Sequence, residues 1–95
     1  MNLKSVPVRS ASIVTRKTGN EYILVPVINN IADMTSVYTL NETGAFIWEL
    51  IDGKKTFEEL IDSVIDKYDI DRETATKDVF TFIDNMRNYL IIEDQ

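Results

Sequence analysis

The front part of the chain contains three stretches rich in β-branched and apolar residues, which predicts three β-strands. The first two span Ser10 to Lys17 (SASIVTRK) and Glu21 to Val27 (EYILVPV), and the turn residues Thr18-Gly19-Asn20 join them as a hairpin. Ile28 to Thr35 is a polar-leaning connection. It leads to a short third strand, Ser36 to Leu40 (SVYTL).

A short apolar helix is predicted directly after the third strand. Asn41 is a suitable N-cap, Glu42 suits the positive end of the helix dipole, and Gly53 closes the segment. Five large apolar residues follow the cap within a few positions: Phe46, Ile47, Trp48, Leu50 and Ile51. So short a helix leaves little surface for water, which places it at the centre of the core.

The second helix begins at a capping box, in which Thr56 caps an N–H of the first turn and Glu59 reaches back to Thr56. It carries a single apolar stripe of Leu60, Ile61, Val64, Ile65 and Tyr68. We expect Asp71 to cap a third helix, from Arg72 to about Leu90, and a short extended tail to follow it.

The apolar face of the third helix is wider on one flank than on the other. The core-facing stripe is predicted to contain Ala75, Val79, Phe82, Met86 and Leu90. Ile83 and Phe80 widen it on the flank that also carries Thr76 and Arg87, whereas Asp78 and Asn85 make the opposite flank polar. Two interpretations stay open: Phe80 packs on the sheet or the tail, or it forms the apolar wall of a binding groove.

The length and charge of the chain limit the classes of protein to which it can belong. At 95 residues we expect one domain, residues 1–95, with residues 1–9 as a loosely ordered N-terminus. There is no apolar run long enough to span a membrane and no secretory signal at the N-terminus, and a cysteine-free chain of this kind fits the cytoplasm. The sequence has 10 basic and 16 acidic residues. Four basic and two acidic residues precede Glu42, so six basic and fourteen acidic residues belong to the helical part. That acidic excess disfavours binding to nucleic acid.

The sequence lacks the residues of the common catalytic and metal sites. It contains no histidine and no cysteine, which excludes Ser-His and Cys-His triads and the usual zinc ligands. Asp69-x-Asp71-x-Glu73 resembles the start of a calcium loop, but Thr74 and Phe80 occupy the positions that need glycine and glutamate. We therefore predict no enzyme activity, no cofactor and no metal.

A function in binding is the remaining possibility, and the third strand is the candidate binding surface. Ser36 to Leu40 carries no Lys or Pro that would protect a free strand edge. An extended peptide can add to such an edge, with its apolar side chains against a neighbouring helix.

Three motifs resemble one protein family. They are L-N-x-T-G-x-x-I-W-x-L-I-D-G at residues 40–53, T-F-E-E-L-I in the second helix, and Y-D-I-D…D-V-F-T-F-I-D-N-M around the third. Together they resemble the pyrroloquinoline quinone biosynthesis protein D family, also called the recognition element of ribosomally synthesised and post-translationally modified peptides. The resemblance covers about Ser10 to Glu93.

The resemblance implies an α+β, winged helix-turn-helix-like fold, in which a three-stranded antiparallel sheet precedes three helices. It implies an adaptor that binds the leader segment of a precursor peptide and presents it to a maturation enzyme, either a radical S-adenosylmethionine protein or a leader-cleaving protease. The leader would pair with the third strand, at Ser36, Val37, Tyr38, Thr39 and Leu40. From the widened flank we assign the helical wall of the groove to Thr76, Val79, Phe80, Ile83 and Arg87.

Two other functions are weighed against this one. A winged-helix DNA-binding regulator is compatible with the fold class, but the second helix carries Glu58, Glu59, Asp62 and Asp66 against Lys67 alone. The exposed strand edge can also pair two protomers as a homodimer. Arg87 is open to two roles, either pairing with a leader carboxylate or covering apolar surface with its stem. No nucleic acid and no membrane are predicted as partners.

Overall fold

The structure is a computed structural model that describes residues 3–19, 21–28, 31–32, 37–88 and 92–94. Its elements follow in chain order: β1 (Pro7–Arg9), β2 (Ile13–Thr18), β3 (Glu21–Ile28), β4 (Ile31–Ala32), β5 (Tyr38–Leu40), α1 (Glu42–Leu50), α2 (Phe57–Tyr68), α3 (Arg72–Asn88) and β6 (Ile92–Asp94). Among the described residues, no helix has the length and apolar character that crossing a membrane requires.

A three-stranded antiparallel sheet is formed by β2, β3 and β5, with β3 in the middle. The hairpin pairs Ile13 with Pro26 at one end and Thr18 with Glu21 at the other. On its second edge β3 pairs with β5 near its start and with the short β4 near its end. This sheet followed by three helices confirms the predicted α+β fold.

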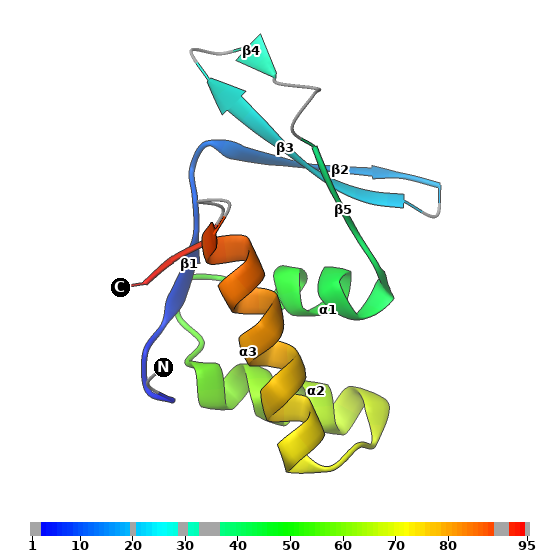
Figure 1. The fold of residues 1–95 in the computed structure, drawn as a ribbon, viewed down its shortest axis with the longest axis vertical. Helices are drawn as coiled ribbons and strands as arrows, with labels where there is room; N and C mark the ends of the chain where they lie inside the picture. The colour runs from blue at the N-terminus through cyan, green and yellow to red at the C-terminus, as the bar shows by residue number, and fades with distance from the viewer. Residues whose placement is uncertain (1–2, 20, 29–30, 33–36, 89–91, 95) are drawn as a thin grey trace.

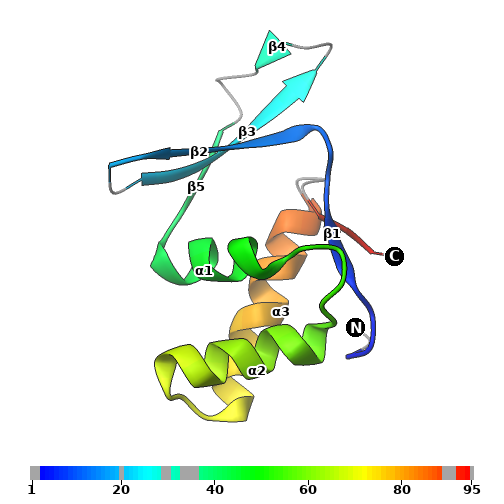
Figure 2. The same cartoon turned by 180° about the vertical axis from the view of Figure 1, so that it is seen from behind.

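The core lies between the sheet and the helices, with α1 in the middle layer. Figures 1 and 2 show α1 between the sheet and α2, while α3 runs past both helices. Trp48 of α1 is buried, and its Nε1 donates to Thr15 Oγ1 of β2 at 3.0 Å. The predicted central position of this helix is therefore confirmed. The buried cluster comprises Tyr22, Leu24, Leu40, Ile47, Trp48, Ile51, Phe57, Leu60, Ile61, Val64, Ala75, Val79, Ile83 and Met86.

The helix starts follow the predicted capping signals. Asn41 Oδ1 accepts from the Gly44 N–H at 2.8 Å, and both halves of the Thr56–Glu59 capping box form at the start of α2. Asp71 accepts from the Thr74 hydroxyl and N–H at the start of α3, and these hydrogen bonds lower the pKa of the Asp71 carboxyl.

The end of α1 differs from the prediction that Gly53 closes the helix. The helix ends at Leu50, and Ile51 is already extended while its N–H donates to Trp48 O at 3.1 Å. Leaving the helix at this point keeps the Ile51 side chain buried. Gly53 lies in the following bend with φ +79°. There Asp52 accepts from the Lys55 ammonium and from the N–H groups of Lys54 and Lys55, which lowers the pKa of Asp52.

The N-terminal segment also differs from the prediction, because residues 3–9 are held on the helices. β1 pairs antiparallel with β6, so the first and the last described strands lie side by side (Figures 1 and 2). The first turn of α2 donates from Phe57 N–H to Ser5 O and from Glu58 N–H to Leu3 O, both at 3.0 Å. These two N–H groups have no partner within their helix, which explains why the segment binds there. Arg9 adds a cation–π contact, with its guanidinium 4.6 Å from the centroid of the Trp48 ring.

Candidate functional site: a groove between β5 and α3

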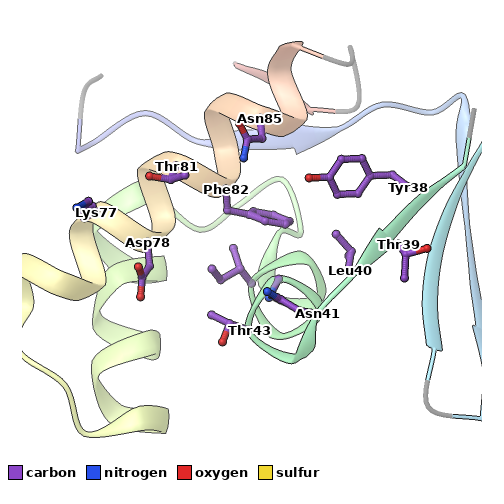
Figure 3. A pocket seen from close by; sticks show the side chains of 12 residues that line it. Tyr38, Thr39, Leu40, Asn41, Thr43, Lys77, Asp78, Thr81, Phe82 and Asn85 are labelled. Atoms are coloured by element: carbon purple, nitrogen blue, oxygen red, sulfur yellow. The ribbon is translucent and has the colours of Figure 1, made fainter.

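A cavity of about 460 Å³ opens between β5, the start of α1 and one flank of α3 (Figure 3). The strand and its corner contribute Tyr38, Thr39, Leu40 and Asn41, and α1 contributes Thr43, Gly44 and Ile47. Helix α3 contributes Lys77, Asp78, Thr81, Phe82 and Asn85. A concave site formed by three elements beside a strand edge is suited to an elongated ligand.

The floor of this cavity is apolar. Leu40 and Ile47 are buried, and the half-buried Phe82 is the one large apolar side chain that α3 contributes. In Figure 3 the Phe82 ring reaches from α3 toward α1, and the Tyr38 ring reaches from β5 toward α3. The two rings thus flank the space where a guest side chain would enter.

The rim of the cavity is polar and carries both signs of charge. Lys77, Asp78, Thr81 and Asn85 are all exposed along the same flank of α3. This flank is therefore compatible with contact to water, and it presents hydrogen-bond donors and acceptors at the cavity.

The register of the sheet identifies which backbone groups of β5 are available. Val27 N–H donates to Ser12 O at 2.7 Å, so every second residue of β3, counted from Val27, directs its backbone toward β2. The residues between them, Tyr22 and Leu24, direct theirs toward β5, where they lie opposite Leu40 and Tyr38.

It follows that Thr39 turns its N–H and C=O away from β3, because neighbouring strand residues alternate in direction. No strand that the structure describes pairs with β5 on that side. Thr39 is therefore the residue whose main chain is presented at the open edge of the sheet. The side chains of Tyr38 and Leu40 lie on the opposite face from that of Thr39, and they point toward α3 (Figure 3).

The structure brings most of the predicted strand residues to the cavity. Tyr38, Thr39 and Leu40 line it. Val37 comes directly before β5 and is 38% exposed, and Ser36 lies outside the described residues.

The predicted wall residues of α3 do not line this cavity. Val79 and Ile83 have no exposed surface, and the Phe80 ring packs edge-on against Phe57 with centroids 5.9 Å apart. Thr76 is half-buried outside the cavity, and Arg87 forms an ion pair with Asp84 at 3.2 Å. The reason is that the first turn of α2, held by the N-terminal segment, occupies the flank that the sequence left open. The cavity lies on the polar flank instead.

One further cavity residue, Gly44, carries a signal that is visible in the sequence. Gly44 follows Thr43 in the family-like motif, and it lies in the first turn of α1, although glycine is a weaker helix former than alanine. A Cβ at Gly44 would lie 3.2 Å from Phe82 Cε1 and 3.2 Å from Asn41 Oδ1. A glycine inside a helix can thus indicate close approach of a side chain from another element, and here that side chain belongs to the cavity floor.

A second cavity of about 460 Å³ lies between the hairpin end and α1, and it shares Leu40 and Asn41 with the first. Its wall includes Tyr22, whose hydroxyl donates to Glu49 Oε1 at 2.6 Å. Burial, and then the hydrogen bond to Glu49, raises the pKa of Tyr22 to about 12. This hydroxyl therefore keeps its proton at neutral pH, and it does not suit proton transfer there.

The chain is similar to a described family in sequence and to a solved complex in structure. The family model of Coenzyme PQQ synthesis protein D (PqqD) matches residues 21–92, which is more than half of the chain. The fold superimposes with a TM-score of 0.75 on a solved structure described as "TbiB1 in Complex with the TbiA(beta) Leader Peptide", at 24% identity, over 90% of this chain and 94% of that chain. The comparison with curated proteins found no match.

Proposed function

The chain belongs to the PqqD family, and from that premise we propose that it binds the leader segment of a ribosomally made precursor peptide as an added strand on β5. The observation that carries this proposal is the coincidence of an open main-chain edge at Thr39 with the cavity between β5 and α3. The fold neighbour TbiB1 was solved with a leader peptide, which supports the same class of ligand.

The register specifies how the peptide would lie. One guest residue sits opposite Thr39 and pairs with its N–H and C=O. That residue turns its side chain to the outer face of the sheet, as Thr39 does. The guest residues on either side of it turn theirs to the face of Tyr38 and Leu40, and hence into the cavity above Phe82. Main-chain pairing thus supplies affinity, and the cavity supplies selectivity.

We propose further that the protein is a non-catalytic adaptor that presents the bound leader to a maturation enzyme. A radical S-adenosylmethionine protein and a leader-cleaving protease are the two enzyme classes that we consider. The absence of histidine and cysteine from the chain supports a role in binding. The acidic helical part supports a docking surface for a partner with a basic face.

The test is a fluorescence-anisotropy titration with synthetic peptides that tile the front halves of the short reading frames beside the gene. The informative variant is Thr39→Pro, because it removes the outward N–H and leaves the hydrogen bonds of Tyr38 and Leu40 to β3 in place. We expect affinity to fall roughly tenfold or more, since a main-chain hydrogen bond is lost and the ring obstructs pairing.

Lys17→Pro is the matched control. Lys17 directs its N–H outward from β2, at the opposite edge of the same sheet, so this proline should leave peptide affinity unchanged. Circular dichroism and thermal unfolding would establish that both variants fold. Equal affinity of Thr39→Pro and the unaltered protein would show that the peptide does not pair with β5. No binding of any peptide to the unaltered protein would overturn the proposed function itself.

A further inference from the structure

We propose that Gly44 sets the depth of the cavity, and so the size of the guest side chain that it accepts, by allowing the Phe82 ring to lie against the first turn of α1. This inference rests on the proposed function, because it concerns the selectivity of the same site. Gly44 acts here as a positioning residue that works through Phe82.

The backbone conformation at Gly44 does not require glycine. Gly44 lies inside α1, and the glycines with positive φ are Gly19 and Gly53. Alanine is a better helix former at such a position. The chain therefore accepts a weaker helix at Gly44, and the reason must lie in what approaches it.

The approaching group is the Phe82 ring. A Cβ at Gly44 would lie 3.2 Å from Phe82 Cε1, which is closer than a Cβ ordinarily packs, and at an ordinary contact distance of 3.5 Å from Cδ1. The cap oxygen Asn41 Oδ1 would also lie 3.2 Å away, but it belongs to α1's own first turn, whereas the ring comes from another element. The ring contacts backbone where every other residue type would present a side chain. Gly44 is thus a position at which the Phe82 ring of α3 lies close to the first turn of α1.

An added methyl group would move the ring toward the cavity. On the α1 side, Asn41 Oδ1 is held by its hydrogen bond to the Gly44 N–H at 2.8 Å. Along α3, the neighbours Val79, Ile83 and Met86 are fully buried, so the ring cannot retreat into the core. The open side of Phe82 faces the cavity, and displacement in that direction makes the cavity shallower.

The selectivity consequence is specific. A guest residue with a large apolar side chain above Phe82 needs the full depth, whereas alanine at the same guest position does not. Gly44→Ala should therefore weaken binding of a peptide with the large residue at least about fivefold, as overpacking of a fitted apolar contact does. It should leave binding of the alanine-substituted peptide unchanged.

The experiment measures anisotropy for four proteins: unaltered, Gly44→Ala, Phe82→Leu, and the double variant. The probes are the tightest-binding tiled leader peptide and a set of its single-alanine versions. The double variant should recover most of the lost affinity, because the shorter leucine relieves the contact with the new methyl group. Glu42→Ala is the control, since it alters the same turn of α1 at an exposed residue that does not line the cavity between β5 and α3. Thermal unfolding would verify that each variant is folded.

Each result decides between two outcomes. Two results together support the inference. Gly44→Ala binds the leader peptide more weakly than the unaltered protein does but binds one alanine-substituted peptide equally well, and the double variant recovers affinity. Equal binding by Gly44→Ala and the unaltered protein overturns it and leaves the proposed function intact. A uniform loss across all peptides, or no recovery in the double variant, also overturns it, because the effect would then act through the helix cap. If no peptide binds the unaltered protein, the proposed function fails and this inference fails with it.

Discussion

The two flanks of α3 differ in what they contact, although they belong to the same helix. On the closed flank, Val79 and Ile83 have no exposed surface, and Phe80 packs on Phe57 of α2. On the open flank, exposed polar residues such as Thr81 and Asn85 flank Phe82, whose ring forms part of the cavity floor. The more apolar flank is the one that packs in the core, and the more polar flank is the one that borders the cavity.

The difference has a simple physical origin. A flank with several large apolar side chains is stabilised by covering them, so the chain itself covers them when it can. Here α2 does so, fixed by hydrogen bonds from Phe57 and Glu58 to the N-terminal segment. A groove that stays open in water has a polar rim and limits its apolar surface to the floor, as the open flank does.

The largest expected effect is on the closed flank. Ile83→Ala should lower the free energy of unfolding by about 2–5 kcal/mol, because the removed atoms are fully buried and leave a cavity behind. Urea denaturation followed by circular dichroism measures it. A loss well below 1 kcal/mol would mean that this flank is not closed as the structure has it.

A smaller effect is expected at Phe80, the residue that the sequence had placed in the groove wall. Phe80→Leu should cost about 1 kcal/mol of unfolding free energy, mainly through loss of the edge-to-face contact with Phe57. Peptide affinity, measured by anisotropy on folded protein, should not change. A clear drop in affinity at unchanged stability would instead favour the sequence-based groove on the closed flank.

The smallest effect on stability is expected on the open flank. Asn85→Trp should change the unfolding free energy by no more than about 0.5 kcal/mol, because the position is exposed. The indole would nevertheless fill the entrance of the cavity, so peptide affinity should fall at least about tenfold. Asp84→Trp is the matched control: the next residue along the chain is also exposed but lies outside the cavity. Equal affinities for the two tryptophan variants would refute the assignment of the groove to this flank.

Local signals made most of the fold predictable from the sequence. Asn41, Thr56 and Asp71 cap their helices as predicted, because a cap depends only on residues within the next turn. The end of α1 was predicted too late, since Ile51 leaves the helix to reach the core, and that choice depends on tertiary packing. The N-terminal segment was predicted to be loosely ordered. Its order could not be predicted from local signals, because its partners, the first turn of α2 and β6, lie far away in sequence.

The candidate site was predictable only in part. A strand edge without a protecting Lys or Pro is visible in the sequence, and Tyr38 to Leu40 do line the cavity. Which of these residues presents its main chain depends on pairing with β3, and the sequence alone does not contain that register. Helical periodicity showed that the two flanks of α3 differ, but it could not show which one faces β5. The contact of Phe80 with Phe57, at the turn of α2 that binds the N-terminal segment, is a tertiary contact that helical periodicity does not reveal.

The pairing of β1 with β6 determines how the molecule would respond to mechanical load. The strands are antiparallel with Pro7 opposite Asp94 and Arg9 opposite Ile92, so the pair nearest the C-terminus is Pro7 with Asp94. A force that pulls Asp94 away from β1 would therefore separate the residue pairs one after another. The carbonyl groups of Leu3 and Ser5 would meanwhile keep the N-terminal segment bonded to α2. No residue of β6 lines the cavity between β5 and α3, so separation of β6 from β1 would remove none of the residues that line the groove.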